Sequence, residues 1–362
     1  MLVAVPPRKV AGRSTYIVAV ENKRSQQTWY MEVSTVEISV KGKLVNVPSA
    51  RINDREIIVT GKWLKVAVVK DAEWLEGEVV DHPETFIAAL KQFPSKPDIF
   101  TFSQRLGATE LKYPYQVECD NVAAIPITTY SDWWEKRLPQ VSRKNVRRSQ
   151  RRGVVARLAT FDDELVHGIT RIYNETPVRQ GRRFWHYGKD FATVKKDNST
   201  YRDRSEFVAA YHQDELIGFI KIVYVDKVAR IMQILSMNQH FDKRPANMLI
   251  AKAVEACCQR GASHFIYGKY VYDNKKNSPL TEFKRRNGFE QMMVPTYYVP
   301  LTSKGRIALA LNLHLGVKKM IPESLMKVLL NSRTKLYEWR GIGCDSTAKE
   351  ENSERGEKVA GE

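Results

Sequence analysis

The chain has few cysteines, few histidines and no long apolar run. Among 362 residues there are four cysteines and seven histidines. Cys257 and Cys258 are adjacent, whereas zinc ligands usually come as pairs separated by two residues. No apolar stretch approaches the ~18–20 residues of a membrane helix. Prolines also interrupt the first residues, where a signal peptide needs continuous apolar sequence. We therefore expect a soluble cytoplasmic protein with reduced thiols, no disulfide framework, no metal site and no membrane span.

Basic residues clearly outnumber acidic ones. The chain has 58 Lys and Arg against 41 Asp and Glu, which gives a formal net charge of +17. Hydrophobic residues make up 43% of the chain, enough for a large core, so wholesale disorder is excluded. The length suits two domains. We expect a weakly ordered N-terminal extension, an α+β domain, a second domain, a C-terminal helical segment and a disordered tail, at residues 1–30, 31–135, 136–301, 302–340 and 341–362.

The second domain has the clearer pattern. Its first helix is expected to begin with Ser142 as N-cap and to end at Gly153. A strand, two helices, three strands joined by tight turns, a helix ending at Gly261, a strand, a helix ending at Gly288 and a final strand follow. This β-α-α-β-β-β-α-β-α-β order predicts an α+β fold with a mixed, mainly antiparallel sheet flanked by helices. It differs from a doubly wound nucleotide-binding fold.

This order of elements resembles the GNAT acyltransferase fold across residues 154–301. Two features are similar to the Fem-type aminoacyltransferase branch: the segment FKRRNGF, from Phe283 to Phe289, and the basic helix RKNVRRSQRRG before the first strand. Members of that branch carry two GNAT-like domains, which would suit residues 31–135. The resemblance implies an N-acyltransferase that moves an acyl or aminoacyl group from acyl-CoA or aminoacyl-tRNA to an amine. Acceptors would be an amino sugar, an amino acid or a peptide, and no metal is needed.

The resemblance places the activated donor where the fourth and fifth strands part, near residues 235 and 267. The following helix would present its amino end to phosphate, as helix N-termini do. Here the chain departs from the family pattern, because HFDKRPANML contains no glycine where GNAT enzymes have a glycine-containing loop. Lys284 also stands in the stretch where many of those enzymes have a tyrosine. The donor-binding candidates are Gln233, Leu235, Ser236, Lys243, Arg244, Asn247, Lys284 and Arg285.

A basic and aromatic loop from Arg179 to Gly188 is expected to overhang the acceptor site. Arginine suits bidentate capture of a carboxylate or phosphate, and an exposed aromatic ring can stack on a sugar. The alternative is an ordered loop whose aromatic side chains fill the core. The acceptor-binding candidates are Arg179, Gln180, Arg183, Trp185, Tyr187 and Tyr272.

Four residues are candidates for catalysis. Lys269 and Tyr270 follow the fifth strand and would stabilise the oxyanion or protonate the leaving group. His186 would act as a general base, since imidazole titrates near neutral pH. Glu206 would deprotonate the amine through water. Each has a structural alternative: a surface loop for the first two, a hydrogen-bonded histidine, and an ion pair on a strand.

The run from Arg143 to Arg152 holds six Lys and Arg in ten positions and no acidic residue. Three interpretations are open: a solvated helix face, a site for an anionic small molecule, or a surface that contacts an RNA backbone such as that of tRNA. The last one also supports an alternative function for the whole chain, a basic nucleic-acid-binding protein on a catalytically inactive GNAT-like fold.

Overall fold

The computed structural model describes residues 8–315, apart from 11–12, 23–26, 41–42, 73–74, 76–78, 109, 180 and 273–277. The chain divides into two compact units, one ending at Ser303 and one beginning at Lys304. The expected disordered tail at 341–362 and most of the expected helical segment at 302–340 lie outside the described residues. The part of that segment that is described contains α8 (Ser303–Ala310) and η4 (Leu313–Leu315).

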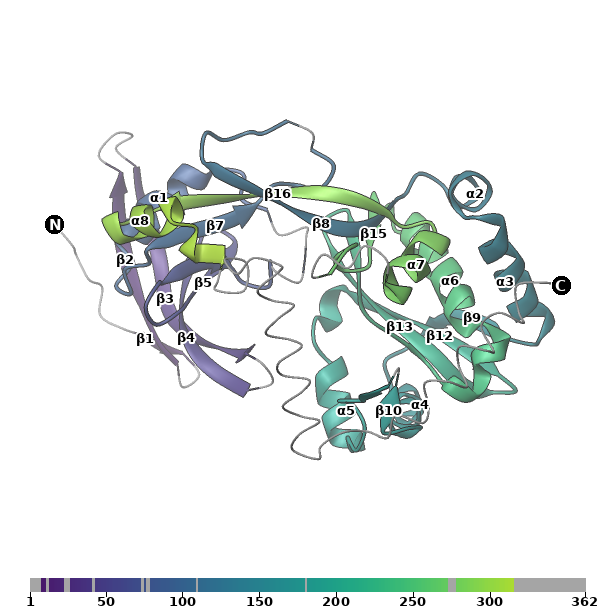
Figure 1. The fold of residues 1–362 in the computed structure, drawn as a ribbon. Helices are drawn as coiled ribbons and strands as arrows, with labels where there is room; N and C mark the ends of the chain where they lie inside the picture. Colours follow the sequence, from purple (N-terminus) through teal and green to yellow (C-terminus); the bar gives the residue numbers. More distant parts are fainter. Residues whose placement is uncertain are drawn as a thin grey trace, which may run out of the picture. The chain divides into compact units, whose positions relative to one another are not determined.

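The first unit is built on one fourteen-stranded sheet with the strand order β1-β2-β3-β4-β5-β6-β7-β16-β8-β15-β14-β13-β12-β9 (Figure 1). Its first eight strands in the sequence are β1 (Arg8–Val10), β2 (Arg13–Asn22), β3 (Gln27–Val40), β4 (Lys43–Ile52), β5 (Arg55–Thr60), β6 (Val66–Val69), β7 (Ile99–Ser103) and β8 (Gln116–Pro126). The other six are β9 (Val155–Ala159), β12 (Ser205–His212), β13 (Glu215–Val225), β14 (Val228–Ser236), β15 (His264–Ile266) and β16 (Glu290–Pro300). A separate two-stranded hairpin consists of β10 (Val178–Arg179) and β11 (Arg182–Arg183).

Helices and single turns connect these strands. Before β9 they are α1 (Pro83–Lys91), α2 (Tyr130–Asp132), the π-helical η1 (Trp133–Arg137) and α3 (Gln140–Arg151). After it come α4 (Asp163–Asn174), α5 (Phe191–Asn198), η2 (Arg202–Arg204), η3 (Asn238–Lys243), α6 (Pro245–Gln259) and α7 (Pro279–Arg286). From β9 to β16 this is the predicted order of elements, with the β10–β11 hairpin added where we expected a loop, and the predicted fold class is confirmed. None of the helices in the described part of the chain is long and apolar enough to cross a membrane.

Alternate side chains of β12 pack against helices on opposite faces of the sheet. Val208 and Ala210 belong to a core cluster with residues of α3 and α6, whereas Phe207 and Ala209 belong to one with residues of α4 and α5. This follows from the two-residue period of a strand. The helix pairs cover the two faces of the β12–β13 part of the sheet (Figure 1). Helices therefore cover both faces of the sheet at β12 and β13, next to β14.

Strand β16 joins the two halves of the sheet. It pairs antiparallel with β8 over Glu290–Tyr298 and with β7 over Thr296–Pro300. Its Tyr297 is fully buried and lies in the core of the first half, beside Phe102 at a ring-centroid distance of 5.2 Å. The sheet therefore continues across the expected domain boundary at residues 135 and 136, and the division into domains stays a prediction.

Two local expectations differ from the structure. Strands β2 and β3 pair as a hairpin over residues 16–33, so the sheet begins ahead of residue 31, where we expected the folded chain to start. Helix α3 begins at Gln140, and Ser142 is buried inside its first turn. The Ser142 hydroxyl donates to the Arg286 carbonyl oxygen at 2.5 Å, so a partner distant in the sequence replaces the expected cap.

Candidate active site

Strands β14 and β15 part, as the resemblance to the GNAT fold implies. They pair in parallel only between Val228–Arg230 and His264–Ile266. Beyond that point β14 continues along β13, whereas the chain after β15 follows β8: the Tyr267 N–H donates to the Ala123 carbonyl oxygen at 2.8 Å. A register shift between β13 and β14 falls at Met232, directly before Gln233, and such bulges bend a strand. Gln233, Leu235 and Ser236 all lie on the part of β14 beyond its pairing with β15.

The turn into α6 offers little to a phosphate group. Pro245 in the first turn of the helix has no N–H, and the Asn247 N–H donates to the Arg244 carbonyl oxygen at 3.1 Å. The Asn247 side chain donates to Asn287 at 2.9 Å. Asp242 adds a negative charge, which pairs with Lys243 at 3.6 Å and with Arg152 at 2.5 Å. A glycine-containing loop would present more free N–H groups to an anion.

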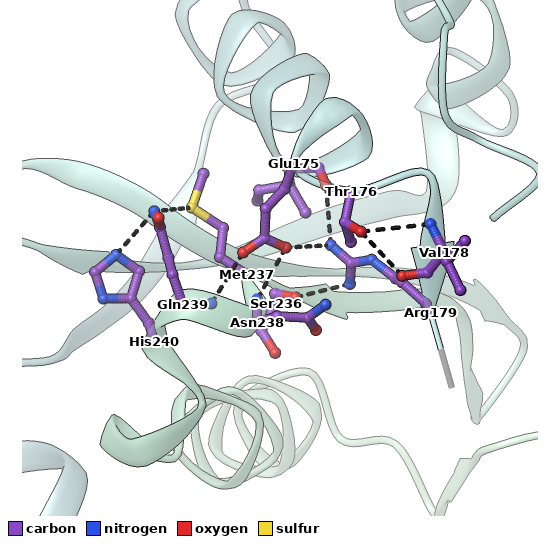
Figure 2. A network of polar contacts seen from close by, with 10 residues as sticks. Glu175, Thr176, Val178, Arg179, Ser236, Met237, Asn238, Gln239 and His240 are labelled. Carbon is purple, nitrogen blue, oxygen red and sulfur yellow. Dashed lines mark hydrogen bonds and ion pairs between the residues drawn. The ribbon is translucent and has the colours of Figure 1, made fainter. Parts of the chain in front are cut away.

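A largely buried ion pair, with each side chain about one seventh exposed, fixes the end of β14 (Figure 2). The Glu175 carboxylate accepts from the Arg179 guanidinium and from the backbone N–H groups of Asn238 and Gln239, each at 2.9 Å. Arg179 also donates to the Ser236 carbonyl oxygen at 2.8 Å. Burial lowers the pKa of the guanidinium, although the Glu175 charge opposes this. Arg179, an acceptor-binding candidate, is therefore occupied by internal partners.

His186 belongs to a buried polar network on β14. Its Nε2 lies 3.0 Å from the Gln233 side-chain nitrogen, and the Gln233 oxygen accepts from the Tyr173 hydroxyl at 2.7 Å. Burial, with a smaller effect of the Lys189 charge, lowers the pKa of His186 to about 4. Burial also raises the pKa of Tyr173 to about 12. Both groups are therefore neutral at neutral pH, and His186 is a weak base.

Three further acceptor candidates, Arg183, Trp185 and Tyr187, flank His186 in the sequence, whereas Tyr272 lies beside Lys284, its ring centroid 4.7 Å from the ammonium nitrogen. Trp185, Tyr187 and Arg183 are exposed, while Phe184 between them is buried. Phe184 lies under the Arg179 guanidinium at 4.6 Å and so anchors the loop. Phe184 therefore agrees with the structural alternative for the loop, whereas Trp185 and Tyr187 stay at the surface and their contact with an acceptor stays a prediction. Gln180 lies outside the described residues.

Lys284 is fully buried beneath the segment that follows β15. Its ammonium group donates to the Lys269 carbonyl oxygen at 2.5 Å and lies 4.7 Å from the ring centroids of both Tyr267 and Tyr272. Burial, with a smaller contribution from the Arg230 charge, lowers its pKa to about 8. Since Arg230 is the last residue of β14 that pairs with β15, the ammonium group lies near the point where the strands part.

Lys269 and Tyr270 lie on the same segment. The exposed Lys269 ammonium pairs with Asp120 of β8 at 2.5 Å. Tyr270 is partly buried and packs against the core on the α6 face, and its carbonyl oxygen accepts from the Thr281 hydroxyl at 3.3 Å. Of the catalytic candidates, these two are the ones that lie beside Lys284.

Two candidates lie elsewhere. Glu206 lies on β12, which β13 and β14 separate from β15. It accepts from the Tyr224 hydroxyl and from Arg260 after α6, both at 2.8 Å. This matches its structural alternative, an ion pair on a strand. Arg285 is exposed on α7 and pairs with Glu282 at 2.7 Å, one turn earlier.

Sequence reasoning missed Tyr173 and Glu175. Glu175 follows α4 directly. The N–H groups that donate to Glu175 belong to residues more than sixty positions later, so no local sequence pattern predicts the contact. No group of three or more His, Cys, Asp or Glu suited to a metal ion occurs among the residues that the structure describes.

The basic run forms the outer face of α3. Its two end arginines are paired, Arg143 with Glu135 at 3.6 Å and Arg152 with Asp242 at 2.5 Å. Arg147 lies over the Trp134 ring at 6.0 Å. Lys144, Arg148 and Arg151 are exposed. Through Arg152 the helix reaches the turn into α6, next to the candidate donor site.

Residues 139–285 match the family model described as "Acetyltransferase (GNAT) domain". No curated protein matches the chain by sequence. A crystal structure of FemX is similar over 75% of this chain and 88% of its own, at 11% identity and a TM-score of 0.50. L-PGS from Bacillus licheniformis covers 73% of this chain and 83% of its own, at 13% identity and a TM-score of 0.46. At this sequence identity the FemX comparison shows the fold of the chain.

Proposed function

Since residues 139–285 match the model of a GNAT acetyltransferase domain and the chain folds like FemX, we propose that the protein is an N-acyltransferase. It would transfer an acyl or aminoacyl group from an activated donor to an amine acceptor such as an amino sugar, an amino acid or a peptide. The observation that carries this proposal is the parting of β14 and β15 beyond Arg230 and Ile266. Strand edges that part leave backbone groups free to bind an extended donor.

The turn into α6 supports an aminoacyl-tRNA donor over an acyl-CoA donor. Pro245 and Asp242 are poorly suited to holding a pyrophosphate at the amino end of the helix, where N–H groups and the helix dipole normally favour one. The basic face of α3 is joined to the same turn through Arg152 and Asp242. An RNA donor would make its phosphate contacts on that face.

The reaction would proceed by direct attack of the neutral amine on the donor carbonyl carbon. A carbon–nitrogen bond forms, and the carbon–oxygen bond of an ester, or the carbon–sulfur bond of a thioester, breaks. The leaving oxygen or sulfur keeps the electron pair and takes a proton, while the new amide nitrogen loses one. Positioning of the two substrates and stabilisation of the oxyanion would supply most of the rate enhancement.

Lys284 is the best-placed group for the leaving-group proton. A buried ammonium with a pKa of about 8 is charged at neutral pH and still gives up its proton readily. The proton released by the attacking nitrogen would then restore the charged form. Lys269 and Tyr270 would support the donor from the same segment. His186, with a pKa of about 4, would hold the acceptor loop in place instead of acting as a base.

The test is a transfer assay with two radiolabelled donors, acetyl-CoA and a mixture of aminoacyl-tRNAs, against glucosamine, lysine and a short peptide. We expect transfer from aminoacyl-tRNA and a loss of at least about 100-fold in kcat for Lys284→Met. Lys284→Arg should retain some activity while losing the limb near pH 8 in the kcat/KM profile. Lys252→Met on α6, a change at a surface ion pair, is the matched control. No transfer from either donor to any acceptor would contradict the proposal.

The alternative is a nucleic-acid-binding protein on a catalytically inactive fold. The specific observation in its favour is the exposed basic face of α3, formed by Lys144, Arg148 and Arg151. Retention of RNA or DNA together with a complete lack of acyl transfer would support this alternative. Transfer activity that depends on Lys284 would exclude it.

A further inference from the structure

Trp185 is a large aromatic side chain held at the surface. It is 73% exposed, whereas Phe184 and His186 on either side of it are buried. A chain that needed only to fill its core would gain nothing from an indole in this position, because exposed apolar surface contributes no burial energy. Its surroundings show that the ring is nevertheless fixed.

The inner side of the indole has two contacts. Its ring centroid lies 3.6 Å from that of His186, and the Lys189 ammonium nitrogen lies 4.2 Å from it. The same nitrogen lies only 3.4 Å from His186 Nδ1. Groups on opposite faces of an indole would be much farther apart, so both contacts fall on one side. With most of Trp185 exposed, the opposite face of the ring is left to solvent.

The groups beneath the indole are fixed in their turn. Lys189 pairs with Asp197 at 2.7 Å, and His186 is held by Gln233 of β14 at 3.0 Å. The loop also receives a hydrogen bond at its far end, where the Gly188 N–H donates to the Asn174 side-chain oxygen at 2.7 Å. The indole therefore loses little further freedom when a ligand covers it, which lowers the entropic cost of binding.

We infer that the outer face of Trp185 is a stacking surface for a ring of the acceptor substrate that has an apolar face, either a pyranose or a nucleobase. This inference rests on the proposed function in treating the ring as part of the amine acceptor. A rigid aromatic surface with exposed polar neighbours, here Arg183 and Tyr187, suits a ring whose faces are apolar and whose edge carries hydrogen-bonding groups. An acyclic amine has no such face.

The experiment is saturation-transfer difference NMR on the full chain without any acyl donor. The probes are methyl β-glucosaminide for the sugar, cytidine for the nucleobase, and butylamine as the ring-free amine. We expect at least one ring probe to bind the wild type and its signal to fall at least fivefold in Trp185→Ala. Trp63→Ala is the matched control, because Trp63 is 62% exposed and lies between β5 and β6; it should leave the signal unchanged.

Each outcome decides the inference. A pyranose or nucleobase signal that depends on Trp185 supports it and identifies the ring. Equal signals in wild type and Trp185→Ala, a signal from butylamine alone, or no signal from any probe would overturn it. Because no donor is present, binding that depends on Trp185 would stand even if acyl transfer were never observed. Conversely, acyl transfer that Trp185→Ala leaves unchanged would overturn the inference and leave the proposed function intact.

Discussion

Burial decides which side chains near the site are charged. His186 is only 6% exposed, and its ring lies 4.1 Å from that of Tyr173. Its pKa of about 4 follows mainly from this loss of solvation. Lys221 on β13 is similarly buried, and its pKa falls to about 8 while it donates to two carbonyl oxygens and the Thr200 hydroxyl. The buried Lys221 ammonium can thus stay charged because several oxygen atoms accept its hydrogen bonds, whereas the buried His186 imidazole stays neutral.

Acid should destabilise the protein through His186. Its pKa of about 4 is below the ordinary value near 6.5, so the unfolded chain takes up a proton first as the pH falls. The free energy of unfolding contributed by this group is present above pH 6.5 and is lost progressively down to pH 4, by at most about 3 kcal/mol. Urea unfolding of wild type and His186→Asn at pH 7 and pH 4.5 measures it. The difference between the two proteins should depend on pH, while His82→Asn, at an exposed histidine, should follow the wild type.

The Glu175–Arg179 pair shows how one side chain stabilises a junction between elements. It connects the end of α4, the short β10 strand, the last residue of β14 and the start of η3 (Figure 2). Both partners are about one seventh exposed. Removing one charge of a buried pair leaves the other uncompensated, which costs more than the pair itself contributes.

Glu175→Gln should therefore lower the free energy of unfolding by about 3 kcal/mol, since one neutral oxygen replaces a carboxylate with three donors. Thermal and urea denaturation measure the loss. Arg105→Met is the control: its partner Asp226 is half-exposed, and such surface pairs contribute about 1 kcal/mol or less. Equal losses of unfolding free energy in the two variants would show that the Glu175 pair contributes no more than a surface ion pair.

Helix α3 has a row of like charges that repel one another and destabilise the helix as long as no anion neutralises them. Lys144, Arg148 and Arg151 follow one another along one side of the helix, at spacings of four and three residues. Like charges at these spacings destabilise a helix by about 0.2–0.5 kcal/mol per pair. Ser142, Val146 and Ser149, which are buried, hold the opposite side against the core.

We predict that this face binds nucleic acid with a steep dependence on salt. Replacing Lys144, Arg148 and Arg151 together by alanine should reduce the slope of log K against log salt by about two to three, because each lost phosphate contact removes close to one unit. Filter binding with tRNA between low and moderate salt measures the slope. The control is the triple alanine variant of the exposed Lys62, Lys91 and Lys96, which should retain it.

Local sequence signals predicted the elements but not the contacts between them. Gly153 and Gly261 end α3 and α6 with positive φ values of 77° and 68°, so both helices end at the glycines where we expected them to end. The cap of α3 was misplaced because Ser142 bonds to Arg286, far along the chain. The parting of β14 and β15 followed from the family resemblance. The burial of Lys284 and the internal partners of Arg179 depend on packing that no short pattern encodes.

For the molecule as a whole, β16 makes the stability of one half depend on the other. It lies between β7 and β8 in the sheet order, so its loss would separate the two sets of strands within the first unit. Tyr297 of β16 is fully buried beside Phe102 and is hydrogen-bonded to Gln104. A change at this residue should therefore destabilise the strands on both sides of β16 in the sheet order.

Tyr297→Ala should lower the free energy of unfolding by about 3–5 kcal/mol, as removal of a large buried aromatic side chain does. Hydrogen exchange followed by mass spectrometry should show weaker protection in both β7 and β13, on opposite sides of β16. Met293→Ala, at a half-exposed site on the same strand, should alter neither strand. Loss of protection in β7 alone would mean that the halves unfold separately.

The position of β16 also constrains synthesis on the ribosome. Strands β7 and β8 end by residue 126, yet the strand that lies between them is translated only at residues 290–300. Until then each of the two strands has a bare edge, and exposed edges are prone to pairing with other chains. The nascent polypeptide must therefore emerge almost to the end of its first unit before β16 can pair with β7 and β8. Chaperone protection would matter most during that interval.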